Sequence, residues 1–124
     1  CTKKSKWWMW SVGVRVGQIK SRAGGCLHAK WSDESVASAA ISRCMSHMDQ
    51  QWMFDDTTGL INLRDNLCLD SDDKFLVKCD ASADSQKWSH DEATGKLRSN
   101  DDRCLDAPQA DQKEGLVHTW TSYP

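Results

Sequence analysis

The sequence predicts an all-β fold in which three similar units close into a pseudo-threefold barrel. Three observations carry this prediction: many short β-prone segments between turn residues, no apolar stripe of helical period, and an internal repeat of about 40 residues. A unit of that size cannot bury its own apolar face, so the units have to pack against one another. The chain has 124 residues, enough for a single domain covering residues 1–124.

The cysteines display the repeat most directly. A long separation of 24 or 25 residues alternates with a shorter one of 18 or 11, because the six cysteines are Cys1, Cys26, Cys44, Cys68, Cys79 and Cys104. A glycine precedes a Cys-Leu pair by nine residues three times, at Gly17, Gly59 and Gly95. An even set without a Cys-x-x-Cys motif indicates three disulfides and an oxidising compartment.

The second half of each unit ends in a Gln-x-Trp motif, as in Gln50-Gln51-Trp52 and Gln86-Lys87-Trp88. Lys6-Trp7-Trp8 takes the same slot near the N-terminus. A repeated tryptophan at this point can fill the barrel centre, and the repeated glutamine can satisfy backbone groups of an irregular turn. We therefore expect units at about residues 11–52, 53–88 and 89–124, the last completed by residues 1–10.

The strands follow in order from β-prone runs that turn clusters such as Ser71-Asp72-Asp73 separate. The expected strands are 16–20, 26–29, 40–44, 50–54, 60–63, 67–69, 74–79, 86–89, 96–98, 103–105 and 115–120.

Charge and motifs exclude several function classes. The 16 Lys and Arg nearly balance the 18 Asp and Glu, so the net charge of −2 gives no attraction to a phosphate backbone or an anionic membrane surface. No apolar run is long enough to span a bilayer, and a chain that opens on Cys1 reads as a trimmed, secreted segment. Hydrolase, zinc-protease, phosphate-loop and EF-hand motifs are absent, so we expect no enzyme activity, cofactor or metal. The acid pairs Asp55-Asp56 and Asp101-Asp102 are interpreted as solvated loop residues.

The Cys-Leu-Asp and Gln-x-Trp motifs resemble those of the ricin B-type (R-type) lectins, a family of β-trefoils, over essentially the whole chain. The stretch from Cys1 to Trp10, followed by Cys26-Leu27, is also similar to the cysteine-rich domain of the mannose-receptor family. The resemblance implies an all-β, disulfide-stapled β-trefoil. It also implies that Trp52 and Trp88 belong to the core and that sugar is held beside them.

In R-type lectins an Asp directly after Cys-Leu and an aromatic residue two positions before the second Cys of the unit hold the sugar. The third unit fits best, with Asp106 in the carboxylate slot, Trp120 in the aromatic slot, and His118 two residues earlier on the same strand face. The alternative is that Trp120 belongs to the barrel and His118 to the surface.

The other two units depart from the family pattern. The second keeps Asp70 and Gln86 but has Val77 in the aromatic slot, so Phe75 would have to substitute, and a structural role is favoured over a second sugar site. The first has His28 in place of the Asp and Ser42 in the aromatic slot. Its remaining candidates are a tryptophan in the loop, Trp31, and a closing Asp49-Gln50 pair, and His28 is interpreted as a surface residue.

The resemblance also implies one disulfide within each unit, which pairs Cys26 with Cys44 and Cys68 with Cys79. The expected partner of Cys104 would fall at Ser122, so Cys104 is expected to pair with Cys1, brought near where the termini meet.

We expect a secreted or extracellular lectin domain that binds galactose or N-acetylgalactosamine on glycans or glycoproteins, with no nucleic-acid partner and no membrane insertion. Two alternatives remain: a trefoil that serves only as a protein-interaction or inhibitor scaffold, and the binding module of a larger toxin or glycosidase. One fold hosts all of these functions. A homo-oligomer and a module of a larger chain are both compatible with the sequence.

Overall fold

The computed structural model describes residues 10–12, 16–21, 25–64, 66–73, 75–106, 115–116 and 118–121, of which residues 106, 115–116 and 118–121 are described by their backbone alone. The strands are β1 (Trp10–Val12), β2 (Val16–Gly17), β3 (Ile19–Ser21), β4 (Cys26–Trp31), β5 (Ala37–Ser42), β6 (Trp52–Phe54), β7 (Ile61–Leu63), β8 (Leu67–Cys68), β9 (Val77–Lys78), β10 (Trp88–His90), β11 (Leu97–Ser99), β12 (Arg103–Asp106), β13 (Gly115–Leu116) and β14 (His118–Thr121). Two short 3-10 helices are η2 (Met48–Gln50) and η3 (Asp84–Gln86). In this part of the chain no helix is long and apolar enough to cross a membrane.

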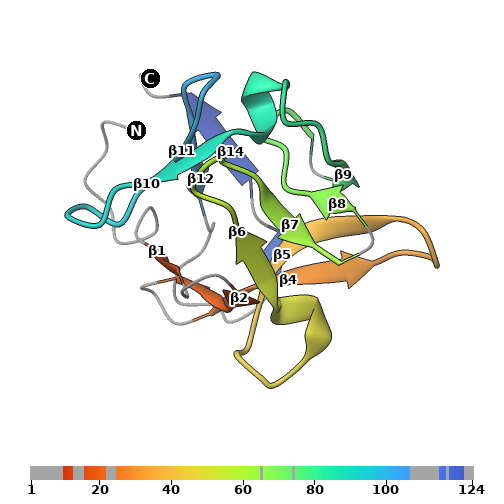
Figure 1. The fold of residues 1–124 in the computed structure, drawn as a ribbon. Helices are drawn as coiled ribbons and strands as arrows, with labels where there is room; N and C mark the ends of the chain where they lie inside the picture. The colour runs from red at the N-terminus through yellow and green to blue at the C-terminus, as the bar shows by residue number, and fades with distance from the viewer. Residues whose placement is uncertain are drawn as a thin grey trace.

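Within the described residues the strands form three antiparallel sheets (Figure 1). Their orders are β1-β3-β4-β5-β13, β2-β6-β7-β8-β9 and β10-β11-β12-β14. Segments distant in sequence join in each of the first two sheets, because β13 pairs with β5 and β2 pairs with β6. The predicted all-β class is confirmed.

A tryptophan from each unit holds the barrel centre. Trp10, Trp52 and Trp88 are 3%, 1% and 3% exposed. Each indole Nε1–H donates to the carbonyl of a Cys-Leu leucine, at 3.2 Å to Leu105, 2.9 Å to Leu27 and 3.1 Å to Leu69, respectively. Equivalent bonds at three sites give the barrel its pseudo-threefold symmetry, and the core assignment of Trp52 and Trp88 is confirmed.

Trp10, and not Trp8, therefore supplies the closing tryptophan of the third unit. Its bond to Leu105 links the N-terminal part of the described chain to β12. The signal was in the sequence, because Trp10 precedes Gly17 by seven residues, the spacing at which Trp52 precedes Gly59. The Lys6-Trp7-Trp8 segment that was assigned to this slot lies outside the described residues.

The repeated glycines bind the closing tryptophan of their own unit. The Trp88 amide donates to the Gly59 carbonyl at 2.8 Å, and the Trp10 amide donates to the Gly95 carbonyl at 2.7 Å. Gly59 has a φ of 83°, and a Cβ there would lie 2.9 Å from the Trp88 nitrogen. Only glycine meets both conditions without strain.

Two predicted disulfides are confirmed, Cys26–Cys44 and Cys68–Cys79. Each joins the first and second cysteine of one unit, and Cys26 and Cys68 are buried. Cys104 is buried and also disulfide-bonded. Its predicted partner, Cys1, lies outside the described residues, so that pairing stays a prediction.

The strand β5 begins three residues earlier than the expected strand 40–44. It runs along β4 from Cys26 opposite Ser42 to Trp31 opposite Ala37. Alanine has a low β propensity, so the sequence did not indicate a strand start at Ala37. Burial of the alanine side chains against the core outweighs that preference. The turn between the strands is fixed by Asp33, whose Oδ1 accepts from two later backbone amides.

Candidate functional site

The residues predicted to hold sugar in the third unit occupy the antiparallel pair β12–β14. Asp106 is paired with His118, and Cys104 is paired with Trp120. Directly opposed positions lie on the same face of a sheet, and so do positions two apart on one strand. The backbone register thus brings the three predicted positions to one face of this pair. The side chains of these residues lie outside the described part of the structure.

The residue in the aromatic slot differs among the three units, and the strand pairing shows which residue lies opposite the first cysteine in each. Trp120 is opposite Cys104 in the third unit, whereas Ser42 is opposite Cys26 and Val77 is opposite Cys68. A stacking platform for a sugar ring needs a flat apolar face. Only the third unit carries a tryptophan at this register position.

In the second unit Asp70 and Gln86 are in contact, but Phe75 is paired with a residue of the first unit. The Gln86 Nε2 donates to Asp70 Oδ2 at 3.3 Å. Phe75 is 37% exposed and forms a backbone bridge with Ser38 of β5. The β8–β9 pairing ends with Val77 opposite Cys68. Phe75 would lie opposite Asp70 only if this pairing extended further.

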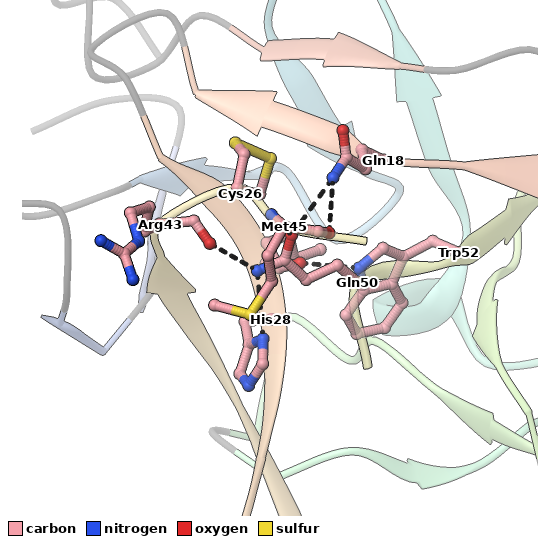
Figure 2. The surroundings of a disulfide bond; sticks show 9 residues. Gln18, Cys26, His28, Arg43, Met45, Gln50 and Trp52 are labelled. Atoms are coloured by element: carbon pink, nitrogen blue, oxygen red, sulfur yellow. Dashed lines mark hydrogen bonds between the residues drawn. A yellow bond between two sulfur atoms is a disulfide. The ribbon is translucent and has the colours of Figure 1, made fainter. Parts of the chain in front are cut away.

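Both Gln-x-Trp glutamines hold the segment around the second cysteine of their unit. The buried Gln50 amide donates to the Arg43 carbonyl at 2.8 Å, accepts from the Met45 amide at 3.0 Å, and lies 3.3 Å from His28 Nδ1 (Figure 2). Gln86 repeats this set, donating to the Lys78 carbonyl at 3.1 Å and accepting from the Asp80 amide at 2.8 Å. The sequence predicted this structural role. It also means that the predicted sugar contact, Gln86, has its amide engaged by the protein.

A cluster of polar side chains in the first unit was only partly foreseen. Trp31, at the end of β4, donates its Nε1–H to Asp49 Oδ1 at 3.0 Å, and Arg64, after β7, lies 2.8 Å from the same oxygen. The Arg64 guanidinium carbon also lies 5.6 Å from the centre of the Trp31 ring. Asp49 and Trp31 were visible in the sequence. Arg64 was not, because it comes from the second unit and nothing in its local pattern points to the first.

Burial and hydrogen bonding compete at Asp49. Burial raises the pKa of the carboxyl, but hydrogen bonds from Trp31 and Arg64 and the charges of Arg64 and His47 outweigh it, so the pKa is lower than usual. Asp49 is therefore an ionised, largely buried carboxylate whose charge is compensated within the cluster.

His28, interpreted from sequence as a surface residue, is half-buried in this cluster. Burial lowers its pKa, the negative charge of Asp49 acts in the opposite direction, and neighbouring His47 adds to the lowering. The two imidazole centres are 6.0 Å apart. His28 takes the position that Asp70 holds in the second unit, and it meets Gln50 as Asp70 meets Gln86.

A second polar network joins the second and third units. The Ser71 hydroxyl donates to the Asp101 carboxylate at 2.6 Å, and Ser99 donates to the same carboxylate. Arg103 donates to the Ser71 carbonyl at 3.0 Å and to Asp72 Oδ1 at 3.1 Å. Asp101 is thus half-buried and bound, which corrects its interpretation as a solvated loop residue. Its neighbour Asp102 stays at the surface beside Arg98.

Among the described residues, no group of three or more His, Cys, Asp or Glu side chains is arranged to hold a metal ion. In the two polar clusters described above, the carboxylates are instead paired with arginine side chains and serine hydroxyls.

Comparison with known proteins places these features in a family. Residues 1–88 match the ricin-type β-trefoil lectin domain, so the match covers the first two units of the barrel. No curated protein shows significant sequence similarity to the chain.

Solved structures share the fold. A designed threefold-symmetric protein, ThreeFoil, superposes with a TM-score of 0.71 at 18% identity, over 86% of this chain and 89% of its own. The hemolytic lectin CEL-III superposes with a TM-score of 0.66 at 23% identity, over 96% of this chain, which spans 28% of that lectin's length. These similarities confirm the β-trefoil. Together with the family match over most of the sequence, they establish that the chain belongs to the ricin-type β-trefoil lectin domain family, a class of carbohydrate-binding domains.

Proposed function

We propose that this domain binds galactose or N-acetylgalactosamine residues of glycans and glycoproteins through Asp106, His118 and Trp120. The proposed binding is non-covalent and involves no chemical reaction. The disulfides and the family are consistent with an extracellular location, and we propose that the domain is secreted.

The backbone register of β12 and β14 is the observation that carries the proposal. It pairs Asp106 with His118 and sets Trp120 two residues further along the same strand. The disulfide at Cys104 and the hydrogen bond from Trp10 to the Leu105 carbonyl both anchor β12. A site supported by paired strands holds its groups more firmly than one on a loop.

The chemistry of the three residues suits a neutral hexose. An ionised carboxylate accepts hydrogen bonds from two adjacent hydroxyls, an indole stacks on the C–H face of the ring, and an imidazole exchanges a hydrogen bond with a third hydroxyl. The corresponding positions of the second unit lack the tryptophan. We therefore expect Asp106, and not Asp70, to carry sugar binding.

Titration of matched variants tests this proposal. Asp106→Asn should weaken binding of methyl β-galactoside and N-acetylgalactosamine by about ten-fold to a hundred-fold, since a hydrogen bond to a charged group contributes about 1.5–3 kcal/mol. Asp70→Asn is the matched control. It occupies the equivalent slot, and we expect unchanged sugar binding at an equal folded fraction.

Equal losses in both variants would contradict the assignment to one unit and would make the second unit a working pocket with Phe75 as its platform. Unchanged binding in both variants, or no sugar binding by the unaltered chain, would overturn the proposal and favour the scaffold function.

A further inference from the structure

An exposed apolar surface beside the strand β6 has no role in the proposed function. Among the described residues, five large apolar side chains are exposed, and four of them belong to β2, to β6 or to the stretch of chain that leads into β6. These four residues, which we call the methionine surface, are Val16, Met45, Met48 and Met53. The fifth, Phe75, lies apart from them and forms a backbone bridge with β5.

Strand pairing and hydrogen bonds bring the segments of the methionine surface together. Val16 of β2 is directly opposite Met53 of β6, so the two side chains project from the same face of the sheet, where they are 56% and 48% exposed. Gln18, directly after β2, donates to the Met45 carbonyl at 3.0 Å (Figure 2). Met48 begins η2, which leads into β6 and lies beside it in Figure 1. The four apolar side chains therefore come from adjoining segments.

The composition of this surface is that of the centre of a protein–protein interface, where methionine is enriched and charged residues are depleted. Between Cys44 and Phe54 the chain carries one acidic residue, Asp49, and one histidine, His47. The Asp49 carboxylate is largely buried and paired with Arg64. Exposed apolar side chains that gather in one place mark interaction sites. We therefore interpret the methionine surface as a docking surface for another macromolecule.

Opposite charges lie at the two ends of the methionine surface. Asp56 follows Met53 by three residues, about 10 Å along an extended chain, and is exposed in the turn after β6. Gln50 precedes Met53 by three residues, and its side-chain amide donates to the carbonyl of the exposed Arg43 at 2.8 Å. The surface thus has an arginine at one end, apolar side chains in the middle and an aspartate at the other end.

This arrangement of charges makes the surface complementary to itself. A twofold rotation about an axis near Met53 exchanges the two ends, so that Arg43 of one copy meets Asp56 of the other and the apolar side chains meet at the axis. An anionic membrane would repel the aspartate end. The strand β2 has only two residues, too few to extend the sheet into another chain, so the contact is made by side chains.

We propose that the methionine surface is a dimerisation surface, which takes a second copy of this chain. The contact is symmetric, with the apolar side chains at the twofold axis and reciprocal Arg43–Asp56 pairs at the rim. It shares no residue with the proposed sugar site and does not depend on sugar binding. A stable interface takes about 20–30 residues from each partner, and this surface is smaller, so we expect a weak dimer with a Kd of about 10–100 µM.

Sedimentation equilibrium of the unaltered chain, at about 5–500 µM, measures the proposed association, and the average mass should rise from monomer towards dimer. Met53→Glu places two like charges across the twofold axis, so we expect at least about ten-fold weaker association. Phe75→Glu is the matched control, because it makes the same kind of change at the exposed apolar residue outside the surface. Its association should equal that of the unaltered chain, and circular dichroism checks that both variants are folded.

Exchange of the two rim charges distinguishes a defined dimer from unspecific association. Arg43→Asp and Asp56→Arg each put like charges together at both ends of the contact, and we expect each to weaken dimerisation about five-fold to ten-fold. The double variant restores opposite charges and should dimerise like the unaltered chain. An equimolar mixture of the two single variants should also recover dimers, because a symmetric contact then pairs opposite charges at both ends. These exposed residues lie outside the core, so this test holds even if Met53→Glu does not fold.

The inference is overturned by a chain that stays monomeric up to about 500 µM, by equal association of Met53→Glu and Phe75→Glu, or by a double variant that associates as weakly as the single variants. Phosphatidylcholine vesicles are the probe for a membrane as the other occupant. A monomeric chain that sediments with these vesicles, and no longer does so as Met53→Glu, would assign the surface to a membrane and overturn the dimer.

Discussion

Replacing Trp88 by alanine tests whether the repeated tryptophans hold the barrel together. Trp88 packs in the core with 3% exposure and donates its indole N–H to the Leu69 carbonyl at 3.1 Å. Truncating a core tryptophan costs about 3–5 kcal/mol. Because the Leu69 carbonyl also loses its donor, we expect a loss near the upper end of that range.

A loss of about 5 kcal/mol is a large fraction of the 5–15 kcal/mol typical of a whole domain. At about 3–4 °C per kcal/mol for a chain of this length, the Tm should fall by roughly 15–20 °C. Thermal and urea unfolding, followed by circular dichroism, measures both quantities. The urea midpoint should move while the m value stays the same.

Trp120→Ala is the matched comparison, because it removes the same side chain from the proposed sugar site. We expect it to abolish most binding of N-acetylgalactosamine and to change the Tm by only a few degrees. The reasoning is refuted if Trp88→Ala melts close to the unaltered protein. A Trp120→Ala variant that melts as low as Trp88→Ala would show that Trp120 belongs to the core.

Two further predictions concern a disulfide and the pH dependence of stability. Peptide mapping without reduction should recover Cys1 linked to Cys104, and a peptide that links Cys104 to any other cysteine would contradict the unit assignment. Burial holds the pKa of His28 below its usual value of 6.5, so the unfolded chain takes up this proton more readily than the folded one. The free energy of unfolding should therefore fall as the pH drops through about 6.5, and His28→Asn should fall less between about pH 7 and pH 5. The stabilisation from ionised Asp49 is lost only at lower pH, because its pKa lies below the usual 3.8. An identical pH dependence of stability in His28→Asn and the unaltered protein would contradict the role given to His28.

The repeat pattern predicted the architecture well because equivalent residues have the same structural role in each unit. The tryptophans of Gln-x-Trp fill the centre, and Gln50 and Gln86 bind the backbone on either side of the second cysteine. The one misplaced motif was the closing tryptophan of the third unit. Without a glutamine two residues earlier, Trp10 lacked its usual marker, and the choice between neighbouring tryptophans depended on the seven-residue spacing to Gly17.

The candidate sites were less predictable. Asp106, His118 and Trp120 lie on β12 and β14, which pair with each other, and their role in sugar binding stays a prediction. Trp31 and Asp49 were candidates in the sequence, but their contact with Arg64 was not anticipated. Arg64 belongs to the second unit, and a repeat pattern describes each unit separately.

The repeat in the sequence was enough to predict the three units, the core positions of Trp52 and Trp88, and two of the disulfides, because these features recur at regular spacing. The folded structure was needed to show that Arg64 of the second unit and Trp31 of the first share the Asp49 carboxylate. Such contacts form when the barrel closes. Packing three units together brings residues into contact across unit boundaries, and the free energy of those contacts depends on geometry that no local pattern encodes.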